Sequence, residues 1–158
     1  MSNVVWTDGS NSTKTGAMGW AVVGEVNGER VRKCGWGGGS NQVAELTAVL
    51  NAMLLVPTAG KIHIVTDSMY AIGVNESWRE NWQRNGYTNY GGNRISNYDL
   101  VRQCHEVYEA RDVTFEHVRG HKGVEGNELA DALCGLARLV GEGRDDLAGL
   151  LADYLEGV

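Results

Sequence analysis

The sequence lacks the features that would place the protein in a membrane or an oxidising compartment. No apolar run approaches the roughly 20 residues that a membrane-spanning helix needs. The amino terminus shows no basic segment followed by a small-residue cleavage site, so we expect no secretory signal. Cys34, Cys104 and Cys134 are odd in number and too scattered for a disulfide framework or a zinc cluster. We therefore expect a soluble, cytoplasmic protein with buried free thiols and no membrane partner.

Basic residues are also scarce. Lysine and arginine number 14 against 20 acidic residues, so the formal net charge is −6 at pH 7. A nucleic-acid partner normally requires positive charge, because Lys and Arg make the contacts to phosphates. Part of the negative charge lies in the carboxyl-terminal tail, and a metal ion would neutralise further acids. The net charge does not exclude a nuclease, whereas the lack of a Lys/Arg run argues against an appended nucleic-acid-binding module.

The apolar pattern predicts a single α/β domain over residues 1–140. The length of 158 residues and the hydrophobic content of 42% suffice for one substantial core. Asn27 and Gly28 separate two apolar segments and predict a hairpin, so the first three strands should be antiparallel. The expected strands are 3–8, 17–26, 29–36, 61–67 and 113–118, and the expected helices are 42–56, 68–74, 77–85, 97–110 and 126–140.

Four carboxylates carry the chemistry, each within a distinctive phrase. They are Asp8 in TDGS, Glu45 in AEL, Asp67 in TDSMY and Asp131 in GNELAD. A group of partly buried acids repels itself unless a cation lies among them. Hard oxygen ligands favour Mg²⁺ or Mn²⁺ over zinc. The set predicts a metal-dependent enzyme acting on phosphodiesters.

The expected elements can bring these four acids together. Asp8 and Asp67 each close an apolar strand, and open α/β sheets place their chemistry at strand ends. Glu45 would reach the same edge from a helix. Asn127 and Asp131 are four residues apart on the last expected helix and share a face, so Asn127 could support Asp131, and we also count Asn127 among the candidate substrate-binding residues.

Each of these acids has an ordinary alternative when it is taken alone. The two strand-end aspartates could be turn or helix caps, and the two helical acids could be surface residues. For all four acids together, however, these ordinary roles would require four coincidences of phrase, order and spacing. The histidines His63, His105 and His117 lie outside these phrases, and we expect packing or surface roles for them.

The ordered series TDGS, NQVAEL, TDSMY and VRGHKGVEGNELAD resembles type 1 ribonuclease H over roughly residues 3–140. The resemblance implies a ribonuclease H-like fold, with a mixed five-stranded sheet in the order 3-2-1-4-5 flanked by helices. It also implies an endoribonuclease that hydrolyses the RNA strand of RNA/DNA hybrids and leaves 5′-phosphate and 3′-hydroxyl ends. The implied cofactor is Mg²⁺, two ions per site, with Mn²⁺ as a substitute.

The resemblance also implies a role for each residue of the site. Asp8 would bridge the two ions, Glu45 and Asp67 would bind the ion near the leaving group, and Asp131 would bind the ion that activates water. His121 matches the family's loop histidine, which assists proton transfer or product release. A merely solvated loop histidine is the alternative for His121.

Substrate-binding residues follow from the same resemblance. Asn41, with Gln42 beside it, matches a position that contacts the minor-groove side of the hybrid, although a helix N-cap is an alternative role for Asn41. Ser40 and Asn97 match positions around a pocket for a phosphate of the DNA strand. Many relatives carry an arginine where this chain has Gly38, so we expect a phosphate pocket that is either weaker or built differently.

The segment 76–95 matches the family's substrate-handling protrusion. Trp78 and Trp82 match aromatic residues that line the channel for the DNA strand. An aromatic pair that only supports a small subdomain is the alternative. The segment carries arginines but no lysine, so its positive charge is low.

The acidic tail at 141–158 lies outside the resemblance and is expected to be helical. Its leucines could share one face, and this face either packs on the domain or docks on a partner protein. These leucines are Leu147, Leu150, Leu151 and Leu155. We otherwise expect a monomer.

Two other functional classes remain open from the sequence. One is a different nuclease of the same fold, of the junction resolvase or transposase type. The other is a non-catalytic hybrid-binding module, although a binding module would have little need for four mutually repelling carboxylates.

Overall fold

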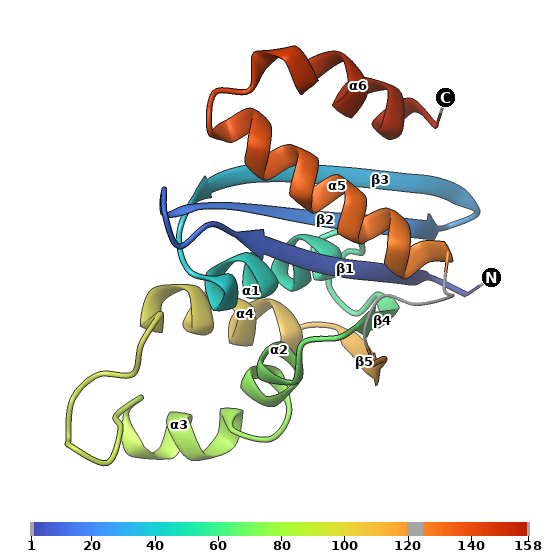
Figure 1. Cartoon of the computed structure of the whole chain (residues 1–158). Helices are drawn as coiled ribbons and strands as arrows, with labels where there is room; N and C mark the ends of the chain where they lie inside the picture. The colour runs from blue at the N-terminus through green and yellow to red at the C-terminus, as the bar shows by residue number, and fades with distance from the viewer. Residues whose placement is uncertain (1, 120–124, 158) are drawn as a thin grey trace.

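The structure is a computed structural model that describes residues 2–119 and 125–157. Figure 1 labels the elements along the chain. The strands are β1 (Val4–Asn11), β2 (Ala17–Val26), β3 (Glu29–Gly38), β4 (Lys61–Thr66) and β5 (Asp112–His117). The helices are α1 (Asn41–Met53), α2 (Met69–Asn75), α3 (Arg79–Asn85), α4 (Tyr98–Glu109), α5 (Glu125–Gly141) and α6 (Ala148–Glu156), with a 3₁₀ turn at Asp145–Leu147. Within these residues, no helix is long and apolar enough to cross a membrane.

The five strands form one mixed sheet in the order β3-β2-β1-β4-β5, which confirms the predicted topology. Strands β1, β2 and β3 pair antiparallel, whereas β4 runs parallel to β1, and β5 runs parallel to β4. The β2–β3 hairpin turns at Asn27 and Gly28, whose φ angles of 55° and 79° are both positive. A two-residue hairpin turn needs this backbone conformation, which Asn and Gly adopt at low cost.

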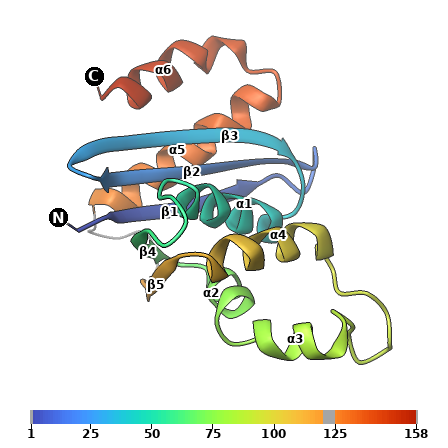
Figure 2. The same ribbon diagram turned by 180° about the vertical axis from the view of Figure 1, so that it is seen from behind.

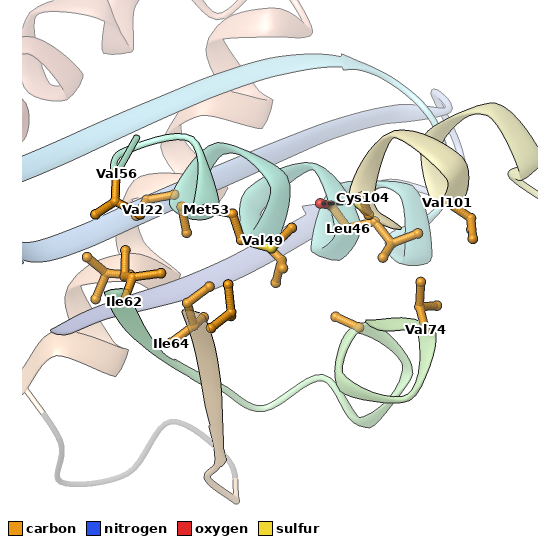
Figure 3. Close-up of a cluster of buried hydrophobic side chains, with 14 of the residues drawn as sticks. Val22, Leu46, Val49, Met53, Val56, Ile62, Ile64, Val74, Val101 and Cys104 are labelled. Carbon is orange, nitrogen blue, oxygen red and sulfur yellow. Dashed lines mark hydrogen bonds between the residues drawn. The ribbon is translucent and has the colours of Figure 1, made fainter. Parts of the chain in front are cut away.

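Helices cover both faces of the sheet, as the two opposite views show (Figures 1 and 2). Side chains alternate between the faces of a strand, so Val22 joins the cluster with α1 and α4, while Ala21 and Val23 join the cluster with α5. Figure 3 shows the first cluster, in which apolar side chains of α1 and α4 meet those of β2 and β4. A rigid sheet held from both sides is thus available to position a site at its edge.

Two element boundaries differ from the sequence expectation by three residues, whereas the others differ by two residues or fewer. Strand β1 continues past Asp8 to Asn11, because residues 8–11 go on pairing with β2. Asp8 is therefore within the strand rather than at its end. Helix α1 ends at Met53, and residues 54–56 form a turn before Pro57.

The tail folds back on its own domain. Helix α6 lies over α5 and β3 (Figure 1), and Leu151 is buried there. Arg30 and Arg32 of β3 donate to the main-chain oxygens of Glu156 and Tyr154, at 2.7 and 2.6 Å. Leu150 does not share the buried face as expected, because its side chain points to solvent. Docking of a partner protein on the tail stays a prediction.

Candidate metal centre and nucleic-acid interface

Two central strands set the position of the first two acids. The parallel pairing of β1 with β4 ends at Trp6 and Val65. Asp8 and Asp67 each follow two residues later, and side chains two residues apart on extended chain point to the same side. The register therefore brings the two carboxylates to the same edge of the sheet. Strand β4 ends at Thr66, so Asp67 lies just beyond its end. Asp8 lies at the same level of the sheet, inside the longer strand β1.

Helix α1 contributes Glu45 to the same place. The main-chain N–H of Gly9 donates to Oε1 of Glu45 and to Oδ1 of Asp8, at 2.9 Å in each case. A Cβ atom at residue 9 would lie 2.7 Å from the nitrogen of Glu45, closer than two such atoms can approach. Only glycine lets β1 come this close to α1. Sequence reasoning missed this role of Gly9.

The three acids lie close enough to share a cation. Oxygen atoms of Asp8, Glu45 and Asp67 lie within 4.8 Å of one another, around a hollow of about 300 Å³ that Asn41 and Ser68 also line. Asp8 is 2% exposed and Glu45 5% exposed. Burial, followed by the charges of Asp8 and Asp67, raises the pKa of Glu45 to about 9, against the opposing effect of the Gly9 N–H. The carboxylate oxygens repel one another, and a hard divalent ion bound among them offsets this repulsion. The residues therefore fit Mg²⁺ or Mn²⁺.

Asp131 approaches Asp8 from helix α5. Ligand atoms of Asp8, Asp131 and Cys134 form a second group within 4.8 Å. Asp8 thus belongs to both groups, which is the arrangement expected of a bridging residue. Asn127 lies one turn before Asp131 and is completely buried.

Cys134 is a neighbour of the site that sequence reasoning did not assign to it. Its thiol donates to the main-chain oxygen of Asp131 at 3.2 Å, and burial raises its pKa. The spacing of three residues from Asp131 on a helix was the available signal. Cys34, Cys104 and Cys134 are free, as predicted, but Cys34 is half-buried rather than buried. His121, the fifth predicted catalytic residue, lies outside the described residues.

Of the predicted substrate contacts, Asn41 lines the acidic hollow, and Ser40 and Gln42 flank Asn41 in the chain. Ser40 is the N-cap of α1, since its hydroxyl accepts from the N–H of Val43 at 3.2 Å. The alternative role of Asn41 as the cap is therefore wrong. Asn41 is instead exposed in the first turn of α1 and lines the hollow, and Gln42 is exposed beside it. Both amides are available to a ligand next to the acids.

Asn97 and the two tryptophans lie near Tyr70 of α2. Asn97 precedes α4 in a left-handed conformation, and its amide donates to the hydroxyl of Tyr70 at 3.4 Å. The rings of Trp78 and Trp82 are 5.7 Å apart, and Trp78 remains 42% exposed. They line a second hollow, of about 580 Å³. Trp82 also packs on the main core, so the pair supports the subdomain and presents a ring to solvent.

The arginines of the protrusion bond within the protein. Arg79 donates to Glu109 and to the main-chain oxygen of Asn75, both at 3.0 Å. Arg84 donates to Asn81, and Arg94 donates to the main-chain oxygen of Gly86. The hollow beside Trp78 is lined mainly by aromatic rings and amides rather than by cations. Stacking and amide hydrogen bonds are the contacts that such a surface offers to a nucleic acid.

The fold and the site together define a class of protein. The sheet has this mixed order, and acids from β1, the residue after β4, helix α1 and helix α5 meet in two groups of candidate metal ligands, which fits the class of nucleases that use divalent metal. Comparison with known proteins agrees. The sequence profile of the RNase H family matches residues 1–138.

Curated relatives match over most of their length. The ribonuclease H of Hyphomonas neptunium is 34% identical over 146 residues, which are 92% of this chain and 93% of the relative. The ribonuclease H of Stutzerimonas stutzeri is 34% identical, over 82% of this chain and 86% of the relative, and that of Pseudomonas fluorescens is 35% identical, over 82% and 87%. The chain therefore belongs to the RNase H family of hydrolases, endonucleases whose substrate is the RNA/DNA hybrid.

Proposed function

We propose that this protein hydrolyses the RNA strand of RNA/DNA hybrids with two divalent ions, leaving 5′-phosphate and 3′-hydroxyl ends. The observation that carries the proposal is the position of Asp8, whose carboxylate belongs to both groups of candidate ligand atoms, one with Glu45 and Asp67 and the other with Asp131 and Cys134. A residue shared by two groups can hold two ions side by side, and paired ions are suited to an in-line displacement at phosphorus.

The residues divide between two ion positions. Asp8, Glu45 and Asp67 would hold one ion, and Asp8 and Asp131 would hold the other. When bound, two Mg²⁺ ions supply the activation of a water molecule and the stabilisation of charge on the leaving 3′ oxygen, and Mn²⁺ fits the same oxygen ligands. Binding requires an ionised Glu45, so metal binding and the loss of its proton are linked.

The chain itself positions these ligands before any ion arrives. The Gly9 N–H holds one oxygen of Asp8 and one of Glu45, so neither side chain rotates freely. Because these two carboxylates are already held in place, metal binding loses less side-chain conformational entropy. His121 is proposed for proton transfer or product release on the resemblance alone.

Substrate recognition is proposed for both strands. Asn41 and Gln42 can bond the 2′-hydroxyl of RNA, the group that distinguishes RNA from DNA, because they are exposed next to the acidic hollow. For the DNA strand, Ser40 and Asn97 would contact a phosphate. Trp78 and Trp82 would provide a stacking surface.

Cleavage of a labelled RNA/DNA hybrid in Mg²⁺, Mn²⁺ or EDTA tests the proposal. Asp8→Asn is the diagnostic variant, and Asp153→Asn, at an exposed position of α6, is the matched control. Single-stranded RNA, duplex RNA, duplex DNA and a four-way junction complete the panel. Metal binding by calorimetry gives a readout that does not depend on turnover.

We expect cleavage of the hybrid alone, dependent on metal, lost in Asp8→Asn together with metal binding and retained in Asp153→Asn. Cleavage of the junction or of duplex DNA in preference to the hybrid would instead assign the protein to another nuclease type. A folded wild type that binds hybrid but cleaves nothing under either metal would refute catalysis.

A further inference from the structure

His105 of α4 is buried, with 1% of its surface exposed, and both of its ring nitrogens have partners. Nε2 lies 2.7 Å from the main-chain oxygen of Val74 at the end of α2. Nδ1 lies 2.9 Å from the hydroxyl of Tyr87, which follows α3. A carbonyl oxygen only accepts, so Nε2 must carry the hydrogen. We call this connection from Val74 through His105 to Tyr87 the His105 bridge.

The surroundings of His105 favour the neutral ring. Burial lowers its pKa, Arg79 of α3 acts in the same direction, and the Val74 carbonyl and Glu109 of α4 act against it. In the neutral ring with its hydrogen on Nε2, Nδ1 is an acceptor and the Tyr87 hydroxyl is its donor. Both bonds of the bridge therefore have a defined direction.

The bridge connects to the exposed aromatic surface through ring contacts. The ring of His105 stacks on Trp82 at 6.5 Å and lies 5.6 Å from the ring of Tyr87. Trp82 in turn contacts Trp78, which lines the hollow of the protrusion and reaches solvent. A chain of ring contacts thus links the buried His105, through Trp82, to the exposed Trp78.

Tyr87 needs such an anchor because its backbone is unusual. Its φ angle is 62°, in the left-handed region that a bulky residue seldom adopts. The main-chain N–H of Tyr87 donates to the main-chain oxygen of Trp82 at 2.7 Å, at the end of α3. The main-chain oxygen of Tyr87 accepts from the N–H of Ile95 at 3.0 Å. Tyr87 therefore joins α3 to the far end of the loop that follows. A costly backbone conformation of this kind persists where several surrounding contacts hold it in place.

We infer that His105 is a positioning residue for substrate: through the bridge it fixes α3 and the following loop against α2 and α4, and so holds Trp78 and Trp82 in place to bind the hybrid. The inference rests on the proposed function, because it takes the tryptophan surface as the hybrid contact. His105 does not touch substrate, and it lies behind the ring of Trp82. Its effect should therefore fall on substrate binding and not on the chemical step.

Steady-state kinetics on the hybrid in Mg²⁺ tests the inference. His105→Leu removes both bonds of the bridge and should raise KM about tenfold, with kcat unchanged within about twofold. His105→Gln keeps a donor for Val74 and an acceptor for Tyr87, so it should restore KM to within about threefold of wild type. Tyr87→Phe deletes only the hydroxyl and should raise KM in the same direction as His105→Leu.

His63 provides a matched control. Its two ring nitrogens also have partners, Thr114 at 2.7 Å and Glu116 at 3.0 Å, but it is on β4, away from the protrusion. His63→Leu should leave KM and kcat at wild-type values. An equal rise in KM for His63→Leu and His105→Leu would show a general effect of losing a bonded histidine and would overturn the inference.

The tautomer is measured without substrate. Nitrogen-15 NMR of the histidine rings should show His105 neutral, with its hydrogen on Nε2. A hydrogen on Nδ1 at neutral pH, an unchanged KM in folded His105→Leu and Tyr87→Phe, or a fall in kcat without a change in KM would each refute the positioning role. If His105→Leu does not fold, the KM of Tyr87→Phe decides.

Failure of the proposed function is distinguishable from failure of the bridge. A wild type that neither binds nor cleaves hybrid refutes the proposed function, and the positioning role with it, while the NMR result still accepts or rejects the bridge itself. A wild type that cleaves hybrid while the KM values stay unchanged rejects the positioning role alone.

Discussion

The main-chain N–H of Gly9 donates to Oε1 of Glu45 across 2.9 Å, and this bond ties the first strand to the first helix where the acids meet. Glu45 is buried among like charges, and it stays in place because a rigid donor holds one of its oxygens. The absence of a side chain at residue 9 thus permits the close approach of β1 to α1 on which this bond depends.

Gly9→Ala should damage both stability and metal binding. The added Cβ would lie 2.7–2.8 Å from main-chain and Cβ atoms of Ala44 and Glu45, so α1 must move away from β1. We expect a loss of about 1–3 kcal/mol in the free energy of unfolding. Metal affinity should fall at least about tenfold, because the partner of a ligand is displaced. Urea denaturation and calorimetry measure the two effects. Gly149→Ala, at an open helical position, is the control, and it should not lower stability.

The metal-free protein should lose stability as pH rises. The pKa of Glu45 is raised from 4.5 to about 9, so between these values the unfolded chain releases a proton that the folded chain retains. The folded state binds more protons, and the free energy of unfolding therefore falls with pH across this window. Urea denaturation in EDTA at several pH values should show this slope in wild type and a smaller slope in Glu45→Gln. Equal slopes in both proteins would contradict the assignment to Glu45.

Two adjacent leucines of α6 should differ sharply when each is replaced. Leu151 is 5% exposed against α5 and β3, whereas Leu150 is 46% exposed. Leu151→Ala should lower the free energy of unfolding by about 2 kcal/mol or more. Leu150→Ala should change it by less than about 0.5 kcal/mol. Hybrid cleavage at low temperature should persist in both variants, because α6 contributes no carboxylate to the site.

The three thiols should react in a definite order. Burial raises the pKa of all three, that of Cys104 to about 12, and Cys34 alone is half-buried. The thiolate is the nucleophile, so native Cys34 should react with iodoacetamide first, and Cys104 and Cys134 should react only after unfolding. Peptide mass spectrometry after timed alkylation at about pH 8 measures the order. Early labelling of Cys134 would show that the site beside Asp131 is open to solvent.

Much of this protein could be predicted from local sequence. The hairpin at Asn27 and Gly28 follows from two residues that accept positive φ angles, and the order of the strands follows from the family that the ordered phrases indicate. Asp8 and Asp67 were predicted to meet because each was expected to close an apolar strand, although β1 in fact continues past Asp8. These features depend on neighbouring residues, so the sequence by itself determined the fold class and the candidate acids.

Other features depend on contacts between distant segments. Gly9 meets Glu45, His105 joins Val74 to Tyr87, and the outward position of Leu150 depends on how α6 packs on α5 and β3. From their sequence neighbours alone, Gly9 would be interpreted as a turn residue, His105 as a packing residue and Leu150 as part of an apolar helix face. Tertiary structure decided these roles, because close approach, hydrogen-bond direction and burial are set by the partner that packing brings near, and not by the residues on either side.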